Sequence, residues 1–194
     1  MSKLIWKGSA QLSPLPAALV TCGSAETPNI LTVAWTGIVC SQPPRTYISV
    51  RPERYSHGLL CETGEFVLHL TTESLLRAVD YCGVKSGRDE DKFAACGLAT
   101  EPGSEVNVPV LADSPLALEC KVFERIPLGS HDLFLADILA VRVEESYLDA
   151  TGRLSLEKAG LIAYTHGSYR ALGRELGTFG WSVRKRPQKR AAEK

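Results

Sequence analysis

NILTVAWTGIVCSQPPRTYISVRPERYS, residues 29–56, holds the strongest structural signals of this chain. Its first part, Ile30–Cys40, is rich in β-branched and aromatic residues, which favour a strand. Two consecutive prolines break that run, and Thr46–Arg51 predicts the next strand. A further proline stops this strand, and the chain then turns into a short helix over Ser56–Glu62. The segment therefore predicts two strands followed by a helical turn.

Strands with short helices between them account for the rest of the chain. Thr72 is placed to cap a helix that Gly83 ends, and a second helix, Glu90–Cys96, is opened by Asp89 and ended by Gly97. The other predicted strands are Ala17–Cys22, Glu65–Leu70, one that begins at Leu116, and Asp132–Glu144. In the strand that begins at Leu116, alternation predicts a polar face made of Glu119, Lys121 and Arg125. Six main strands predict an all-β (or β-rich α+β) protein built as a closed or nearly closed antiparallel barrel with helical excursions.

Length and composition describe an ordinary globular protein. The 194 residues hold 22 basic and 22 acidic side chains, and 44% are hydrophobic. We expect one domain over residues 1–183 and a basic, disordered tail over 184–194. Balanced charge argues against nucleic acid or an anionic membrane as the main partner. No apolar run approaches the roughly 20 residues of a membrane helix, and no secretory signal is evident, so we expect a cytoplasmic protein.

General catalytic and metal-binding motifs are missing from the sequence. No two of the six cysteines have the short spacing of a redox pair or a zinc site, and the four histidines are scattered. We therefore expect no metal site. A dinucleotide-binding GxGxxG, a phosphate-binding GxxxxGK[ST] and a GxSxG elbow are also missing.

The end of the quoted segment is suited to an anion. Ser49 and Arg51 share one strand face, and the turn into the helix adds Arg54, Tyr55 and Ser56. Guanidinium groups, hydroxyls and a helix N-terminus offer donors and positive potential to a phosphate. The alternative is that both arginines pair with surface carboxylates such as Glu53 and Glu62.

The start of the segment is suited to a flat heterocycle. From Thr32 to Gly37 the strand alternates side chains with backbone donors and carries the Trp35 ring. Gly37 would permit close contact with the backbone. The alternative, which these residues alone slightly favour, is an ordinary core strand.

At these residues the sequence resembles the flavin reductase-like, FMN-binding split-barrel family, and most closely its flavoredoxin branch. The resemblance begins with Asn29-x-x-Thr32-Val33-Ala34-Trp35-Thr36-Gly37 and Ser49-x-Arg51-x-x-Arg54-Tyr55-Ser56. It continues through Asp80–Gly83, Ser86–Phe93 and Leu118–Cys120 to Gly129–Phe134, and ends with Tyr164…Tyr169-x-x-Leu172-Gly173. It covers roughly residues 14–173, and the order and spacing of these motifs are more specific than any one of them.

The resemblance implies a Greek-key split barrel that forms a homodimer, with FMN held noncovalently near the subunit interface. In this sequence the isoalloxazine would lie along Thr32, Trp35, Thr36 and Gly37. The phosphate and ribityl chain would be held by Ser49, Arg51, Arg54 and Ser56, with charge from Lys92. Asn29, Cys40 and Tyr55 complete the expected cofactor-binding set, and the expected catalytic residues His131 and Tyr164 would border the open face of the ring. Without the family pattern, Lys92 fits a solvated lysine and His131 an ordinary strand histidine.

The implied function is an FMN-dependent oxidoreductase. It would pass electrons from NAD(P)H, bound transiently, or from a redox partner protein to flavin, a metal ion or a protein acceptor. One alternative is a flavoredoxin-type electron carrier without a nicotinamide site of its own. A second alternative is a non-catalytic module that binds nucleic acid through its basic tail. Two positions depart from the family pattern, because Asp137 replaces the more usual Glu and His69 the more usual Asn.

Overall fold

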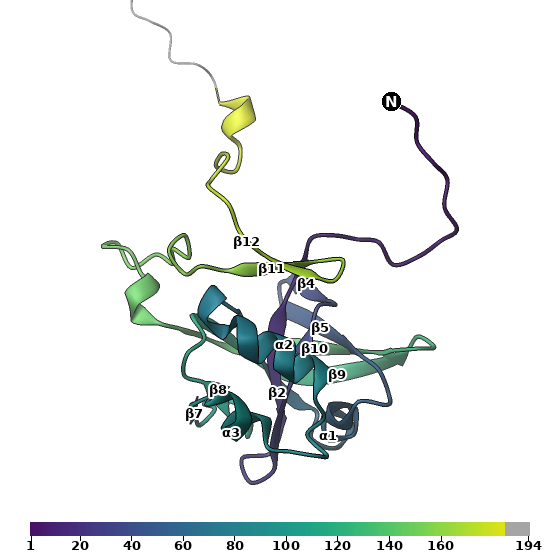
Figure 1. Cartoon of the computed structure of the whole chain (residues 1–194). Helices are drawn as coiled ribbons and strands as arrows, with labels where there is room; N and C mark the ends of the chain where they lie inside the picture. Colours follow the sequence, from purple (N-terminus) through teal and green to yellow (C-terminus); the bar gives the residue numbers. More distant parts are fainter. Residues whose placement is uncertain (185–194) are drawn as a thin grey trace, which may run out of the picture.

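A curved antiparallel sheet of seven strands forms the body of the protein (Figure 1). The structure is a computed structural model that describes residues 1–184. The strand order is β3-β2-β6-β9-β10-β5-β4, and every neighbouring pair is antiparallel. The strands are β2 (Ala18–Gly23), β3 (Pro28–Val33), β4 (Thr36–Ser41), β5 (Pro44–Val50), β6 (Glu65–His69), β9 (Leu116–Pro127) and β10 (Asp132–Val143). The prediction of a β-rich antiparallel protein is confirmed.

The two edge strands of this sheet, β3 and β4, follow each other in the chain. Only Ala34 and Trp35 separate them, and the Ser49 amide of β5 donates a hydrogen bond of 3.0 Å to the Trp35 carbonyl. The sheet therefore curls until its edges approach. The prediction of one continuous strand over Ile30–Cys40 is wrong, because the chain must break at Ala34–Trp35 to pass from one edge of the sheet to the other.

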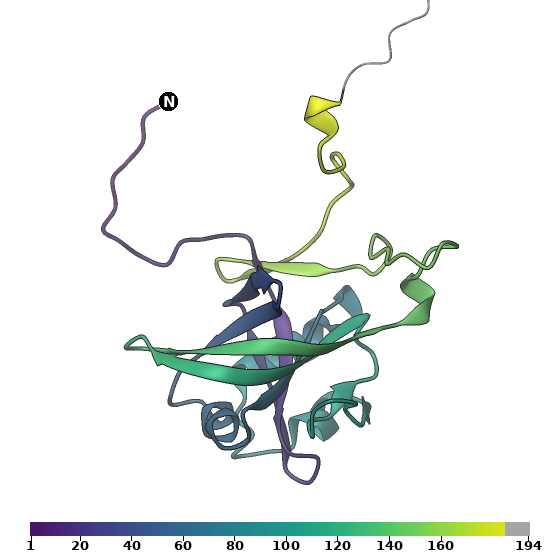
Figure 2. The same ribbon diagram turned by 180° about the vertical axis from the view of Figure 1, so that it is seen from behind.

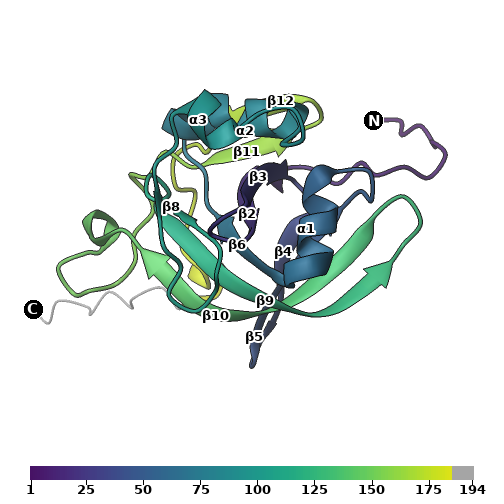
Figure 3. The same ribbon diagram turned by 90° about the horizontal axis from the view of Figure 1, so that it is seen from below.

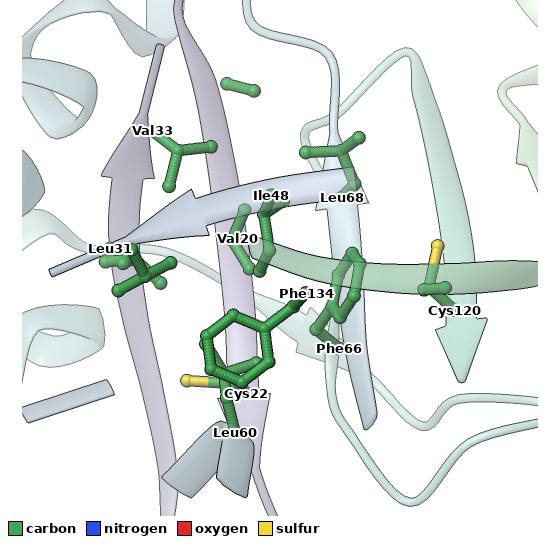
Figure 4. Packing of buried hydrophobic residues seen from close by; sticks show 13 residues of the cluster. Val20, Cys22, Leu31, Val33, Ile48, Leu60, Phe66, Leu68, Cys120 and Phe134 are labelled. Carbon is green, nitrogen blue, oxygen red and sulfur yellow. The ribbon is translucent and has the colours of Figure 1, made fainter. Parts of the chain in front are cut away.

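The inside of the curved sheet is filled by aliphatic and aromatic side chains (Figure 4). Phe66 and Phe134 are fully buried there, beside Leu60 from a helix at one end. Long β9 and β10 wrap around this core, and the helix lies beside them (Figure 3). Burial at this scale is the main stabilising term of such a fold.

Three α-helices flank the sheet: α1 (Tyr55–Thr63), α2 (Leu76–Val84) and α3 (Lys92–Cys96). A 3-10 turn, η1 (Glu73–Leu75), precedes α2. The apolar side of α2 packs on the outer side of β2 and β3, where Val79 and Cys82 join a second core with Leu19 and Ile30. Two predicted helix ends are wrong: Gly83 lies inside α2 at a close contact with β3, and Asp91 rather than Asp89 caps α3.

Two small sheets complete the fold. One joins β1 (Leu15–Pro16), β11 (Ile162–Thr165) and β12 (Ser168–Ala171), and the other joins β7 (Thr100–Glu101) and β8 (Val110–Leu111). Two further 3-10 turns are η2 (Glu145–Tyr147) and η3 (Trp181–Val183). Both ends of the described chain extend away from the barrel (Figure 2). The predicted basic tail, 184–194, falls outside the described residues except for its first residue. Within residues 1–184, no helix is both long and apolar enough to span a bilayer.

Glu119 of β9, which the sequence places on the polar face of its strand, is fully buried. Its carboxylate accepts hydrogen bonds from the Ser104 and Glu105 amides and from the Arg142 Nε at 2.8 Å. These donors hold the pKa of the carboxyl below its usual range against the opposing effect of burial. Glu119 therefore fixes the loop over 102–109, between β7 and β8, to the sheet.

Candidate functional site

Two cavities lie along the seam between β3 and α2. The first, of about 160 Å³, is lined by Asn29 and Leu31 of β3, by Cys82 of α2 and by the loop that follows α2. The second, of about 370 Å³, is lined by Thr32 and Ala34 farther along β3 and by Asp80, Gly83, Val84, Tyr164 and Tyr169. We call them the basic cavity and the tyrosine cavity. Both cavities draw lining residues from β3 and from α2 or the loop that follows it, and we call the two together the β3–α2 groove.

The basic cavity carries an excess of positive charge. Its wall includes one carboxylate, that of Glu53, and four cationic side chains, those of Arg54, Lys85, Arg88 and Lys92. The N-terminus of α1 also faces it, through Arg54, Tyr55 and Ser56. No acidic side chain lies in the first turn of α1, and no side chain caps it. The positive end of the helix dipole is therefore directed to this cavity without an internal counter-charge.

Asn29 and Ser56 form the polar floor of the basic cavity. Both are buried, and the Asn29 Nδ2 donates a hydrogen bond of 2.7 Å to the Ser56 Oγ. The Ser56 hydroxyl keeps its own proton to donate to a ligand. Cys22 lies beneath them, and burial raises the pKa of its thiol to about 12, so the thiol is neutral at physiological pH.

Lys92 brings a buried cation to the same cavity. It is 3% exposed, and its Nζ donates to the Lys85 carbonyl at 3.3 Å. Among residues 1–184, no carboxylate oxygen lies within 4.0 Å of that Nζ. The neighbouring Cys22 and Cys82 thiols have their pKa raised to about 12 by burial, so they supply no negative charge either. Burial accordingly lowers the pKa of Lys92, and an anion in the cavity would relieve that cost.

Two glycines allow α2 and the following loop to approach β3 and α1. A Cβ on Gly83 would stand 3.4 Å from the Thr32 Cβ, and one on Gly87 would stand 3.0 Å from the Tyr55 Cδ1 and closer still to Asn29. Neither glycine was among the predicted site residues. The signal was present, because both belong to the motifs Asp80–Gly83 and Ser86–Phe93.

The tyrosine cavity is shaped by an aromatic pair. Tyr164 and Tyr169 face each other across the β11–β12 hairpin with ring centroids 5.7 Å apart. The Tyr169 hydroxyl donates to the Asp80 Oδ1 at 3.2 Å, and burial together with the Asp80 charge raises its pKa to about 12. Thr32 lines the opposite side, with its Oγ1 donating to the Val79 carbonyl. Tyr169 was missed as a site residue, although its strand register with Tyr164 places it there.

Trp35 and His131 form a separate aromatic pair near the ends of β5 and β10. Their ring centroids are 4.5 Å apart, and the Trp35 side chain is 40% exposed. Partial burial and the positive charge of Arg51 lower the pKa of His131, while the Glu53 carboxylate opposes this shift. Ser49 belongs to the same region, because its amide bonds to the Trp35 carbonyl. His131 is therefore placed as a neutral imidazole beside an exposed indole.

Three of the predicted cofactor residues lie on β4 and line neither cavity. The Thr36 Oγ1 donates to the Tyr47 carbonyl at 2.6 Å, and Gly37 lies against the Tyr47 ring. The Cys40 Sγ donates to the Gln42 carbonyl at 3.4 Å within the β4–β5 turn. The structure thus gathers Asn29, Arg54, Tyr55, Ser56 and Lys92 at one end of the groove and Thr32 and Tyr164 at the other.

Comparison with known proteins agrees with this architecture. Residues 11–173 match the model of the flavin reductase like domain. The flavoredoxin of Desulfovibrio vulgaris (Miyazaki F) superposes with a TM-score of 0.86 at 32% identity, over 94% of this chain and 100% of that one. An FMN-binding protein from Thermus thermophilus superposes with a TM-score of 0.79 at 27% identity, over 92% and 99% of the two chains. An NADPH-flavin oxidoreductase of Streptomyces viridifaciens is 27% identical over 135 residues, 69% of each chain. The chain therefore belongs to the flavin reductase-like family of split-barrel proteins and, within it, to the flavoredoxin branch.

Proposed function

We propose that this protein binds FMN along the β3–α2 groove and works as a flavin-dependent oxidoreductase. The observation that carries the proposal is the buried Lys92 ammonium, which meets no carboxylate among residues 1–184 and faces the same cavity as Arg54 and the α1 N-terminus. A phosphate monoester would compensate this charge through charge-assisted hydrogen bonds. The residues present therefore fit the anionic end of FMN.

The rest of the groove fits the remainder of that molecule. The tyrosine cavity offers apolar and aromatic walls, and Gly83 leaves its backbone accessible beside Thr32. Bound flavin would supply hydride and single-electron chemistry, whereas the protein supplies orientation and electrostatics. Tyr164 and Tyr169 would position the flavin ring in the tyrosine cavity and shield it there from water. His131, neutral and beside Trp35, would border the face at which a nicotinamide or another partner approaches.

Two of the matched proteins support different electron donors. The Streptomyces relative is named as an NADPH-flavin oxidoreductase, which favours a nicotinamide as reductant. The Desulfovibrio protein is a flavoredoxin and matches almost the whole chain, which favours an electron carrier served by a partner protein. We propose an oxidoreductase that takes electrons from NAD(P)H or from a partner protein and passes them to flavin, a metal ion or a protein. The alternative proposal is an electron carrier that has no nicotinamide site of its own.

We further propose that the protein is a homodimer with FMN near the interface. Several large apolar side chains of the seven-stranded sheet are exposed, and apolar surface exposed in this way can mark a contact with another chain. They are Ile38 and Val39 of β4, Phe123 of β9, and Leu139 and Val141 of β10. Light scattering of the purified protein tests this proposal, and a monomer at micromolar concentration contradicts it.

The flavin proposal is tested by titrating the flavin-free protein with FMN and with riboflavin, followed by absorbance and fluorescence. We expect FMN to bind much more tightly, because only FMN carries the phosphate that the basic cavity accepts. Equal affinities for FMN and riboflavin would show that Lys92 and Arg54 do not bind the phosphate. If neither FMN nor riboflavin bound, the flavin proposal would be overturned. Anaerobic addition of NADH, NADPH or a reduced iron–sulphur protein to the FMN complex then identifies the donor by bleaching of the flavin band.

A further inference from the structure

A cysteine, a histidine, a carboxylate and a guanidinium meet on the side of α1 that faces β9 and β10. His57 and Cys61 lie four residues apart on one face of α1, and the His57 Nδ1 is 3.8 Å from the Cys61 Sγ. The other ring nitrogen, Nε2, is 2.9 Å from the Asp132 Oδ2 of β10. The Arg125 Nη1 of β9 donates to the same Sγ at 3.0 Å and lies 3.8 Å from the Asp132 Oδ2. We call these four side chains the Cys61 cluster.

The arrangement is that of a nucleophile, its base and a residue that orients the base. In the tautomer that donates its Nε2–H to the Asp132 Oδ2, the His57 Nδ1 is an acceptor that faces the Cys61 thiol. The His57 ring is held edge-on by Phe134, with centroids 5.4 Å apart. His57 and Asp132 are largely shielded from solvent, whereas Cys61 is exposed. The base is therefore fixed in place and the sulfur is open to a reagent.

The other cysteines lack this environment. Burial raises the pKa of Cys22 and Cys82 to about 12 and that of Cys120 further, so these thiols stay protonated. Cys40 and Cys96 are partly exposed, but the Cys40 thiol donates to the Gln42 carbonyl, and no histidine or arginine of residues 1–184 hydrogen-bonds to the Cys96 sulfur. Within residues 1–184, no three His, Cys, Asp or Glu side chains are grouped so as to hold a metal ion. A metal is therefore no explanation of the Cys61 cluster.

We propose that Cys61 is a modification site that undergoes thiol–disulfide exchange with low-molecular-weight disulfides bearing carboxylates, of the glutathione disulfide type. His57 takes the thiol proton, and Arg125 stabilises the thiolate through its hydrogen bond to the sulfur. The thiolate attacks one sulfur of the disulfide, a Cys61–S–S–R bond forms and the original S–S bond breaks. The departing thiolate recovers the proton from His57 and leaves as a free thiol. One disulfide is consumed and one is formed, so no further oxidant is needed.

The charge of the cluster favours an anionic reagent. Arg125 is about half exposed next to the sulfur, so it is available to a carboxylate of the incoming disulfide. This site is separate from the groove, since no residue of the Cys61 cluster lines the basic or the tyrosine cavity. The inference is thus independent of the proposed flavin.

The test exposes the full-length protein to glutathione disulfide and follows each cysteine by mass spectrometry of its peptide. We expect the Cys61 mixed disulfide to form at least about tenfold faster than that of Cys40 or Cys96, because within residues 1–184 Cys61 has a histidine base and an arginine donor and the other two thiols have neither. His57→Gln and Arg125→Gln should each reduce the Cys61 rate by about tenfold or more. Lys121→Gln, which removes an exposed cation of β9 outside the cluster, should leave the rate unchanged.

Circular dichroism and the thermal midpoint establish that each variant is folded, and the Cys40 rate serves as an internal reference within every sample. Arg125→Gln is the decisive variant, because Arg125 is partly exposed and its loss leaves the core intact. Cystamine, a cationic disulfide, should react more slowly than glutathione disulfide with the wild type, and Arg125→Gln should reduce that preference. Equal rates for Cys61 and Cys40, or rates unaffected by both variants, would overturn the proposal.

Discussion

Gly87 lies so close to Asn29 that a Cβ on this glycine would stand 2.1 Å from the Asn29 Oδ1. Asn29 in turn donates to the Ser56 hydroxyl at the N-terminus of α1. The loop after α2, strand β3 and helix α1 are thus brought together at the floor of the basic cavity. The shape of that floor depends on the absence of one methyl group.

Replacing Gly87 with Ala should reduce FMN affinity by about tenfold, or about 1.4 kcal/mol, because the Asn29 carboxamide must move away from Ser56. Isothermal titration with FMN measures the change. The matched control is Gly58→Ala in α1, where an added Cβ meets no atom within 4 Å. That substitution should raise the free energy of unfolding by about 0.5–1 kcal/mol without changing FMN affinity. Equal FMN affinities in both variants would contradict the role of Gly87.

Lys92→Met separates a ligand-binding lysine from a structural one. Among residues 1–184 the buried ammonium has a carbonyl as its one hydrogen-bond partner, so its removal should leave the free energy of unfolding unchanged or increase it. FMN affinity should fall by roughly 1.5–3 kcal/mol, because a charge-assisted hydrogen bond to phosphate is lost. Chemical denaturation and flavin titration measure the two quantities. Exposed Lys121→Met is the control for a lost lysine charge, and a loss of stability with normal FMN binding would contradict the assignment.

The pKa of His131 should respond in opposite directions to its two charged neighbours. Burial and the Arg51 guanidinium lower this pKa, whereas the Glu53 carboxylate raises it. Arg51→Gln should therefore raise the pKa of His131 in the flavin-free protein, and Glu53→Gln should lower it. A proton NMR titration of the ring Cε1–H, assigned with His131→Asn, measures both. Shifts in the same direction would show that this electrostatic arrangement is wrong.

Local sequence signals were sufficient to locate most of the strands, but they did not indicate where the chain passes from one edge of the curled sheet to the other. β-branched residues and prolines located β2, β5, β6 and β10 to within a few residues. Nothing in Ile30–Cys40 indicated the break at Ala34–Trp35, because the break is imposed by the curling of the whole sheet. The burial of Glu119 was equally hidden, since its partners Ser104 and Arg142 come from distant segments.

The residues of the candidate site also fall into those that the sequence could locate and those that it could not. Arg54, Tyr55 and Ser56 could be located together because they are consecutive at one helix start. Asn29 and Lys92 joined them only through the family pattern, and the structure places all five at one cavity. Tyr169 and Gly87 lie in motifs of the family pattern but were not assigned to the site, because their contacts with Asp80 and Asn29 run across the fold. Spacing along the chain carries no information about such contacts.

The last prediction concerns the pH dependence of stability that His69 causes. This residue replaces the Asn that is more usual in the family pattern. It is fully buried between the Leu19 carbonyl, 3.2 Å from its Nδ1, and the Leu111 amide, which donates to its Nε2 at 3.0 Å. Burial lowers its pKa from 6.5 to about 4, so the unfolded chain takes up a proton below pH 6.5 while the folded protein does not. Stability linked to His69 is therefore complete above pH 6.5 and is lost as the pH falls toward 4.

The advantage of the wild type over His69→Asn in free energy of unfolding should shrink by roughly 3 kcal/mol across that range. Urea denaturation at several pH values measures this, with exposed His166→Asn as the control, because Asn tolerates the positive φ of 43° at that position. Parallel stability profiles for the wild type and His69→Asn would contradict the buried, neutral state of this imidazole.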